Sequence, residues 1–401
     1  MGWCFVMKPL RWFVLVSTCA LVCACSDDDA DAIAGAGATG GTGGVGGTGD
    51  SGASSGTGGT AGAGGAGGTG AIGGSAGSGG SSGVEGDDDG GAIDPVDGAT
   101  DGSSGDYASV RMNELQVVGT HNSYHVLPPI QFDASHGYEH KALDEQLQGG
   151  VRAFELDVHQ GESAREVYHI DLIDPNSTCT LFRDCLQVIE TWSDAHPTHT
   201  PIFVWLEIKD DTGGSAITDL LGVESDLESV FAADGMITPA WLAGDYASPR
   251  ARIDAEGWPL LSEVAGRVMF IVLNRDAHAQ EYTHDFSDLD GRLMFANAVE
   301  AQYDLPWVVV TKIEGDLAQP SIAVAHGKKL LIATNVAAVN MDDVEAMTRN
   351  AQAVASGFHM LKDDLPFMID GRSYFLQLPD GSPGCNAVTA TSACDAATLE
   401  R

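Results

Sequence analysis

Two stretches, GVRAFELDVH at residues 150–159 and PIFVWLEIKD at residues 201–210, decide the fold of this chain. Each is a run of apolar residues that ends in charged side chains, a pattern typical of a buried strand with polar groups at its carboxyl end. Shorter apolar runs occur before, between and after these two stretches. The sequence therefore predicts eight strands, at residues 115–119, 151–158, 167–170, 202–208, 268–273, 293–298, 308–313 and 330–333.

Helix-like patterns separate several of these strands. Apolar residues recur at three- and four-residue spacing in residues 186–195, 217–231 and 344–355, which favours amphipathic helices. Strands that alternate with helices form a parallel sheet, and eight of them within residues 106–401 favour an α/β fold, the (β/α)8 TIM-type barrel. An open doubly wound sheet is the alternative, but no strand is followed by a GxGxxG or P-loop glycine motif.

Acidic residues gather at the predicted strand ends. Because side chains alternate along a strand, Glu155, Asp157 and His159 share the face that points into the barrel. Glu207 ends the fourth strand. Several acids in one barrel mouth repel one another unless a cation lies among them. These carboxylates and the amide oxygen of Asn122 favour a hard ion, Ca²⁺ ahead of Mg²⁺, over zinc.

Two histidines lie at the ends of predicted strands. His121 follows the first strand and His169 lies in the third, and two imidazoles beside a cation site suit acid-base cleavage of a phosphodiester. For His159 we expect a structural role or a role in supporting the site. Glu207 also has an alternative interpretation, an internal salt bridge with Lys209.

The N-terminus carries an export signal. Lys8 and Arg11 precede an apolar run over residues 12–23 that is too short to span a bilayer. The sequence VCAC at residues 22–25 resembles a bacterial lipoprotein cleavage box, in which Cys25 becomes the lipidated N-terminus. Ordinary secretion after cleavage at Ala24 is the alternative. Residues 1–25 are therefore a predicted signal peptide, and we expect the mature protein in the bacterial cell envelope, with a lipid anchor in the membrane, or secreted.

Residues 26–105 are a predicted linker. Residues 31–105 hold 31 of the 51 glycines and no Lys or Arg, so this segment cannot build a core and is typical of a flexible tether. The folded domain is then residues 106–401, which we expect to be a monomer. The whole chain has a net charge of −37, which argues against nucleic acid as a partner.

Four cysteines lie in the predicted domain. An even number of cysteines in an exported domain favours disulfides. Pairing Cys179 with Cys185 and Cys385 with Cys394 is the simplest of three possible connectivities. A zinc site is the rival interpretation, but neither pair has CxxC spacing.

Taken together, the motifs LQVVGTHNSYH, GVRAFELDVH, YHID and PIFVWLEIKD resemble the bacterial Ca²⁺-dependent phosphatidylinositol-specific phospholipases C, in the barrel superfamily of phospholipase-C-like phosphodiesterases. The resemblance covers residues 110–375, and its specific motifs lie in the first half. One departure is Ile170-Asp171, which stands where the eukaryotic pattern has a glycine turn. This departure leaves the head-group preference open.

The resemblance implies roles for individual residues. It makes His121 and His169 the catalytic histidines, and it makes Asn122, Glu155, Asp157 and Glu207 the Ca²⁺ ligands. Candidate contacts for the substrate phosphate on the strands are Lys209, Arg275 and Lys312.

The implied reaction has two steps. The inositol 2-hydroxyl attacks phosphorus after a base, His121 or Glu155, takes its proton, and His169 protonates the diacylglycerol oxygen as it leaves. The product is a cyclic inositol phosphate, which water opens slowly in the second step with the roles reversed. His121 has an alternative role, as an imidazolium that stabilises the phosphate oxygens.

Two rival functions stay open at this point. A glycerophosphodiester phosphodiesterase of the same superfamily would use two histidines and a metal as well. A non-catalytic surface-binding lipoprotein is the second rival, since fold alone does not fix function. The residues after position 105 carry a net charge of −27, so we expect contact with lipid through apolar loops at the barrel mouth rather than through basic patches.

Overall fold

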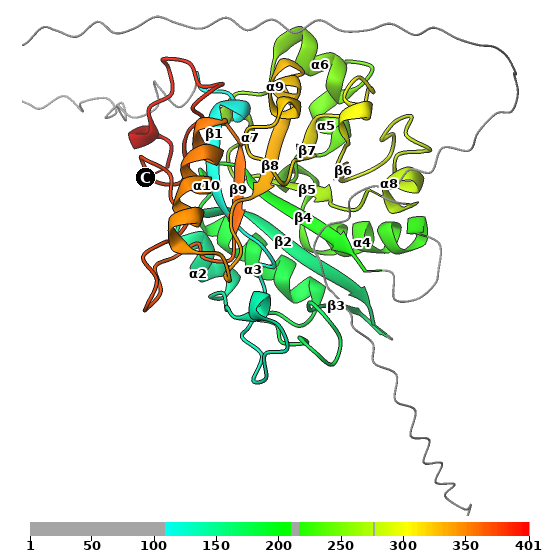
Figure 1. Cartoon of the computed structure of the whole chain (residues 1–401). Helices are drawn as coiled ribbons and strands as arrows, with labels where there is room; N and C mark the ends of the chain where they lie inside the picture. The colour runs from blue at the N-terminus through cyan, green and yellow to red at the C-terminus, as the bar shows by residue number, and fades with distance from the viewer. Residues whose placement is uncertain (1–108, 162, 210–215, 276, 401) are drawn as a thin grey trace, which may run out of the picture. The chain divides into compact units, whose positions relative to one another are not determined.

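The computed structural model describes residues 109–161, 163–209, 216–275 and 277–400. Eight parallel strands form the barrel, in the order β6-β5-β4-β2-β1-β9-β8-β7, and β9 lies directly beside β1 (Figure 1). The bounds of these strands are β1 (Leu115–Thr120), β2 (Val151–Gln160), β4 (Ile202–Ile208), β5 (Val268–Val272), β6 (Phe295–Ala296), β7 (Val310–Lys312), β8 (Leu331–Asn335) and β9 (Met360–Asp363). The predicted (β/α)8 barrel is therefore confirmed.

Side-chain hydrogen bonds join the two strands at the ends of this order. The Lys312 backbone N–H on β7 donates to Asn297 Oδ1, just after β6, at 2.8 Å. Thr311 Oγ1 donates to the Ala298 carbonyl at 2.7 Å. These bonds replace a backbone ladder between β6 and β7 and nearly close the barrel.

One predicted barrel strand is wrong and another was missed. Residues 167–170 do not enter the barrel, because β3 (Arg165–Val167) folds back antiparallel on the end of β2 as a hairpin. The eighth barrel strand is β9, whose sequence MLKD has only two apolar residues. All four residues of β9 are buried nonetheless, because parallel neighbours cover it on both edges.

Helices surround the barrel (Figure 1). The three predicted helices are confirmed as α3, α4 and α10, each with bounds within a few residues of those expected. The helices are α2 (Leu143–Gln148), α3 (Phe182–Ala195), α4 (Ala216–Val230), α5 (Pro239–Ala243), α6 (Pro249–Glu256), α7 (Leu261–Val264), α8 (Ala277–Tyr282), α9 (Pro320–Gly327) and α10 (Asp343–Ala355). Short 3₁₀ turns lie at Met112–Glu114, Ala134–His136, Ala233–Gly235, Glu300–Gln302 and Ala396–Thr398.

Both predicted disulfides are present. Cys179 is bonded to Cys185 and Cys385 to Cys394, with Cα–Cα distances of 5.3 and 5.9 Å. The second disulfide begins in β10 (Gly384–Cys385), which pairs antiparallel with β1 and ties the C-terminal segment to the barrel. Among the described residues, no helix has the length and apolar character needed to cross a membrane. The predicted signal peptide, Cys25 and linker lie outside the described residues.

Candidate active site

The first predicted histidine lies where β1 ends. His121 Nδ1 lies 2.9 Å from Asp364 Oδ1, and its Nε2 lies 3.6 Å from Glu155 Oε1. Asp364 directly follows β9, and its other oxygen accepts from the Val339 backbone N–H at 2.8 Å. Burial alone would lower the pKa of His121, but the hydrogen bond to Asp364 and the negative charge of Glu155 raise it from 6.5 to about 9.

Glu155 lies between cationic groups inside the barrel. Its carboxylate is bonded to the buried Lys362 on β9, and Lys312 Nζ on β7 lies 3.6 Å away. Burial raises the pKa of Glu155, but the positive charges of Lys312, Lys362 and His121 outweigh that effect. They hold the pKa well below the usual range of a carboxyl group, so Glu155 stays ionised. Gly119 makes room for this contact, since a Cβ there would lie 2.8 Å from Lys362 Cγ.

Asp157 and Glu207 share a single lysine. Lys209 Nζ lies 3.1 Å from Asp157 Oδ2 and 2.6 Å from Glu207 Oε1. Burial and the charge of Asp157 raise the pKa of Glu207. The salt bridge expected between Glu207 and Lys209 is therefore present, but Asp157 belongs to it as well.

Asn122 lies next to His121 in a conformation that few residues adopt. Its φ of 44° is in the left-handed region, which asparagine tolerates better than most residues. The loop is held against β2 because the Ser123 backbone N–H donates to the Glu155 carbonyl at 2.9 Å. Ser123 Oγ accepts from the Glu155 N–H at 2.8 Å. These bonds fix Asn122 at the same strand ends as Glu155.

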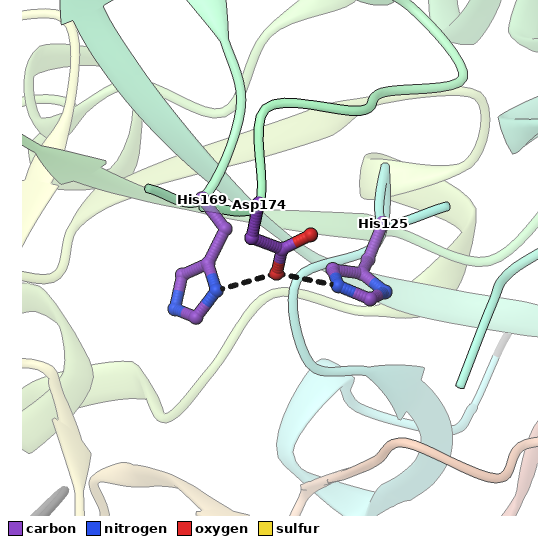
Figure 2. Close-up of side chains that lie close together, drawn as sticks. All are labelled: His125, His169 and Asp174. Carbon is purple, nitrogen blue, oxygen red and sulfur yellow. Dashed lines mark hydrogen bonds and ion pairs between the residues drawn. The ribbon is translucent and has the colours of Figure 1, made fainter. Parts of the chain in front are cut away.

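The second predicted histidine is bonded to an aspartate that the sequence reasoning missed. His169 Nδ1 lies 2.9 Å from Asp174 Oδ2, and His125 Nε2 lies 2.7 Å from the same oxygen, so the carboxylate lies between the two rings (Figure 2). Asp174 is fully buried. Burial would raise its pKa, but the hydrogen bonds to His125 and His169 lower it below its usual range.

Two further residues singled out from the sequence have structural contacts. His159 stacks on Tyr168 with ring centroids 3.6 Å apart, and its Nε2 bonds the Tyr168 carbonyl at 2.9 Å. Arg275 is exposed, and its guanidinium donates to the Lys312 backbone carbonyl. Lys312 is buried and close to Glu155, so of the predicted phosphate contacts Lys312 and Lys209 lie among the acids of the mouth.

The oxygen donors fit a hard divalent cation by their chemistry. Both carboxylate oxygens of Asp157 are buried, and among the described residues its one cationic partner in the salt bridges is Lys209, which Glu207 shares. Two acids with a single lysine keep a net negative charge, which is costly when buried unless a further cation compensates it. Within the described ranges, however, the side chains of Glu155, Asp157 and Glu207 do not come together as a set within 4.8 Å.

The fold and the site define a class of protein, an α/β barrel with histidines and acids close together among its strands. The sequence model of the family described as phosphoinositide phospholipase C, Ca²⁺-dependent, matches residues 110–165 and 161–386. This match covers more than half of the chain. The chain therefore belongs to this family, whose members are phosphoric diester hydrolases.

Several solved structures are similar. A Ca²⁺-dependent phosphatidylinositol-specific phospholipase C from Streptomyces antibioticus is 21% identical, with 64% of this chain and 95% of that chain covered and a TM-score of 0.48. A calcium-dependent enzyme from a Gram-negative Pseudomonas species is 17% identical, with 64% and 91% covered and a TM-score of 0.47. A mutant of the phosphatidylinositol-specific phospholipase C from Staphylococcus aureus is 10% identical, with 66% and 90% covered and a TM-score of 0.41. No curated protein sequence matches the chain.

Proposed function

We propose that this protein cleaves phosphatidylinositol, in a Ca²⁺-dependent reaction, to diacylglycerol and a cyclic inositol phosphate. The observation that carries the proposal is the pairing of each predicted catalytic histidine with a carboxylate through Nδ1, Asp364 for His121 and Asp174 for His169. Such a pairing orients a ring and leaves Nε2 as the atom that exchanges a proton with substrate.

His121 and Glu155 act on the inositol side. We assign both to the attacking 2-hydroxyl because the 3.6 Å between His121 Nε2 and Glu155 Oε1 leaves them side by side. Since the pKa of His121 is raised to about 9, the ring is mostly protonated at neutral pH, which favours stabilisation of the phosphate oxygens by the imidazolium. Glu155, which stays ionised, is then the base.

His169 acts on the leaving-group side. As an imidazolium its Nε2 donates a proton to the diacylglycerol oxygen, while the bond from Nδ1 to Asp174 holds the ring in place. The half-buried position of His169 allows contact with substrate. In the slower opening of the cyclic phosphate by water, the same ring takes up a proton instead.

The predicted Ca²⁺ ligands are Asn122, Glu155, Asp157 and Glu207. A bound calcium ion would supply charge that lowers the pKa of the attacking hydroxyl and neutralises the phosphate. Asp157 contributes buried oxygens, and Lys209 and Lys312 lie close enough to the acids to contact the same phosphate. Arg275 is a weaker candidate for this contact because its guanidinium is engaged by a backbone carbonyl.

We also propose that the protein is exported, as a lipoprotein or as a secreted enzyme. A disulfide-bonded domain suits the cell envelope, and lipidation at Cys25 would hold the enzyme at a membrane where phospholipid is the substrate. We keep residues 1–25 as the proposed signal, 26–105 as the linker and 106–401 as the catalytic domain.

The test is release of the head group from phosphatidylinositol vesicles, with and without a calcium chelator, followed by phosphorus NMR of the product. We expect activity that needs Ca²⁺ and a cyclic phosphate as first product. Full activity in excess chelator would remove the metal from the proposal. Choline release from glycerophosphocholine, or glycerol release from glycerophosphoglycerol, without cleavage of phosphatidylinositol would assign the protein to the glycerophosphodiesterases. No release from any phosphodiester would favour the non-catalytic surface protein.

A further inference from the structure

A compact group of nitrogen and oxygen donors lies outside the predicted calcium ligands. His125 Nε2, His169 Nδ1 and Asp174 Oδ2 all lie within 4.8 Å of one another (Figure 2). In the described part of the chain no other three His, Cys, Asp or Glu side chains come this close. His125 and Asp174 are fully buried, and side-chain rings surround them, including Tyr138 stacked on His125 at 4.2 Å.

The hydrogen bonds of His125 indicate that its Nε2 carries no proton in the neutral ring. His125 Nδ1 lies 3.0 Å from the Tyr138 carbonyl, which only accepts, so Nδ1 must carry the proton. In a neutral ring Nε2 then presents a lone pair to the Asp174 carboxylate at 2.7 Å, which is repulsive. Either His125 is a buried imidazolium, or a cation lies between Nε2 and Asp174. A metal-bound histidine typically has this arrangement, with its other nitrogen held by a carbonyl.

Two buried atoms beside this group lack hydrogen bonds. Asp174 Oδ1 has no partner among the described residues, although the side chain is fully buried. His136 Nδ1 also has none, and it lies 3.8 Å from Asp174 Oδ2 with the residue only 8% exposed. Buried polar atoms are almost always satisfied, so these two atoms point to a ligand that binds among His125, His136, His169 and Asp174.

The donor set selects the class of ion. Imidazole nitrogens with one carboxylate suit Zn²⁺ or a similar transition metal, whereas Ca²⁺ takes oxygen donors. Ligands about 2.0–2.1 Å from a tetrahedral Zn²⁺ are about 3.3 Å apart. The observed 2.7 and 2.9 Å between the nitrogens and Asp174 Oδ2 need to open only slightly to admit the ion.

We propose that His125, His169 and Asp174 form a binding site for a transition-metal ion of the zinc type, which His136 completes as the fourth donor once its ring moves closer, and that the bound ion inhibits the enzyme. Inhibition follows because an ion on Nδ1 would keep His169 from becoming an imidazolium, so that its Nε2–H would be a much weaker acid toward the diacylglycerol oxygen. The inhibitory part rests on the proposed role of His169 in catalysis, whereas binding of the ion does not.

The experiment titrates ZnCl₂ into the purified disulfide-bonded protein in the presence of saturating Ca²⁺, by calorimetry, and repeats the titration with CoCl₂ by visible absorption. We expect one Zn²⁺ per chain and a Co²⁺ spectrum of tetrahedral nitrogen and oxygen ligation without sulfur bands. His125→Gln should weaken binding by about 10- to 100-fold, and His136→Gln should weaken it less. His196→Gln is the matched control, since that exposed ring lies on α3's carboxyl end and bonds the Trp192 carbonyl.

Each result decides a separate part of the proposal. Absence of binding to wild type, or equal binding by wild type and His125→Gln with unchanged thermal unfolding, overturns the site and leaves the imidazolium interpretation of His125. If His125→Gln unfolds, loss of the tetrahedral Co²⁺ spectrum in His136→Gln supports the site and its retention there overturns His136 as a ligand. Zn²⁺ that binds without slowing lipid cleavage overturns the inhibition alone. A protein inactive on phosphatidylinositol would refute the proposed function while the binding data still test the site.

Discussion

Asp364 provides the most direct test of how His121 works. The substitution Asp364→Asn keeps the size of the side chain but removes the negative charge 2.9 Å from His121 Nδ1. The difference between a pKa of 6.5 and one of about 9 for His121 corresponds to about 3 kcal/mol of preference for the protonated ring. Asp364 and Glu155 supply this preference against the opposing effect of burial, so removing Asp364 should bring the pKa down toward or below 6.5.

The assay is the pH dependence of kcat on phosphatidylinositol in mixed micelles with saturating Ca²⁺. In Asp364→Asn we expect kcat to fall by about 10²-fold or more, because the ring loses its orientation and charge. The part of the pH profile that belongs to His121 should move to lower pH. If activity falls as pH rises through that region, the protonated ring is the active form; if activity increases, the neutral ring is the base.

Asp304→Asn is the control for this measurement, because Asp304 is exposed and pairs with Lys328 on the surface. Thermal unfolding separates a chemical effect from misfolding, since Asp364 also accepts a bond from the Val339 N–H that is worth about 1 kcal/mol. A variant that folds normally and keeps both kcat and the pH profile of wild type would refute the role given to Asp364, and with it the pairing that supports the proposed function.

Further predictions concern the histidines, the Ca²⁺ ligands and the contact with lipid. His121→Ala and His169→Ala should each lower kcat by about 10²- to 10⁴-fold with the fold intact, while His159→Ala does much less; a severe His159→Ala variant would show that the second histidine was chosen wrongly. Asp157→Asn should raise the Ca²⁺ concentration needed for half-maximal activity, and an unchanged requirement would remove Asp157 from the ligand set. Phe132→Ser and Leu172→Ser, at exposed apolar loops after β1 and β3, should weaken binding to phosphatidylinositol vesicles, unlike Val344→Ser on α10. Raising salt from about 0.01 to 0.15 M should not weaken the binding, and a steep loss with salt would reveal a basic patch.

The sequence predicted the barrel well where burial on both faces left continuous apolar runs. The central strands β2 and β4 have such runs, and the predicted ranges 151–158 and 202–208 lie within them. The predicted barrel strand at residues 167–170 is wrong because a short apolar run around His169 has the same pattern in a barrel strand and in a hairpin. Strand β9 was missed because Lys362 and Asp363 read as surface residues, although both are fully buried.

Only those residues of the site that local sequence patterns indicate could be predicted. His121, Asn122, Glu155 and Asp157 stand at strand ends, so alternation and order along the chain indicate them. Their partners are set by tertiary contact: Asp364 lies 243 residues after His121. No periodic pattern in the sequence indicates such a pairing. The buried sequence Lys362-Asp363-Asp364, with charges directly after two apolar residues, was a usable signal, since the apolar run before Glu207 also ends in charged residues.

The partners also separate the acids of the mouth into two kinds. Glu155 is surrounded by positive charge, from Lys362, Lys312 and His121, so its ionised form is stable without any added ion. Asp157 and Glu207 have one lysine between them, and burial makes the second negative charge costly. A divalent cation is therefore expected to bind most favourably to Asp157 and Glu207, whereas Glu155 has the charge and position of a base beside His121. On this reasoning Glu155→Gln should reduce kcat more than it changes the Ca²⁺ requirement, and Asp157→Asn should do the reverse. Equal effects of the two substitutions on both quantities would show that Glu155 acts mainly as a metal ligand.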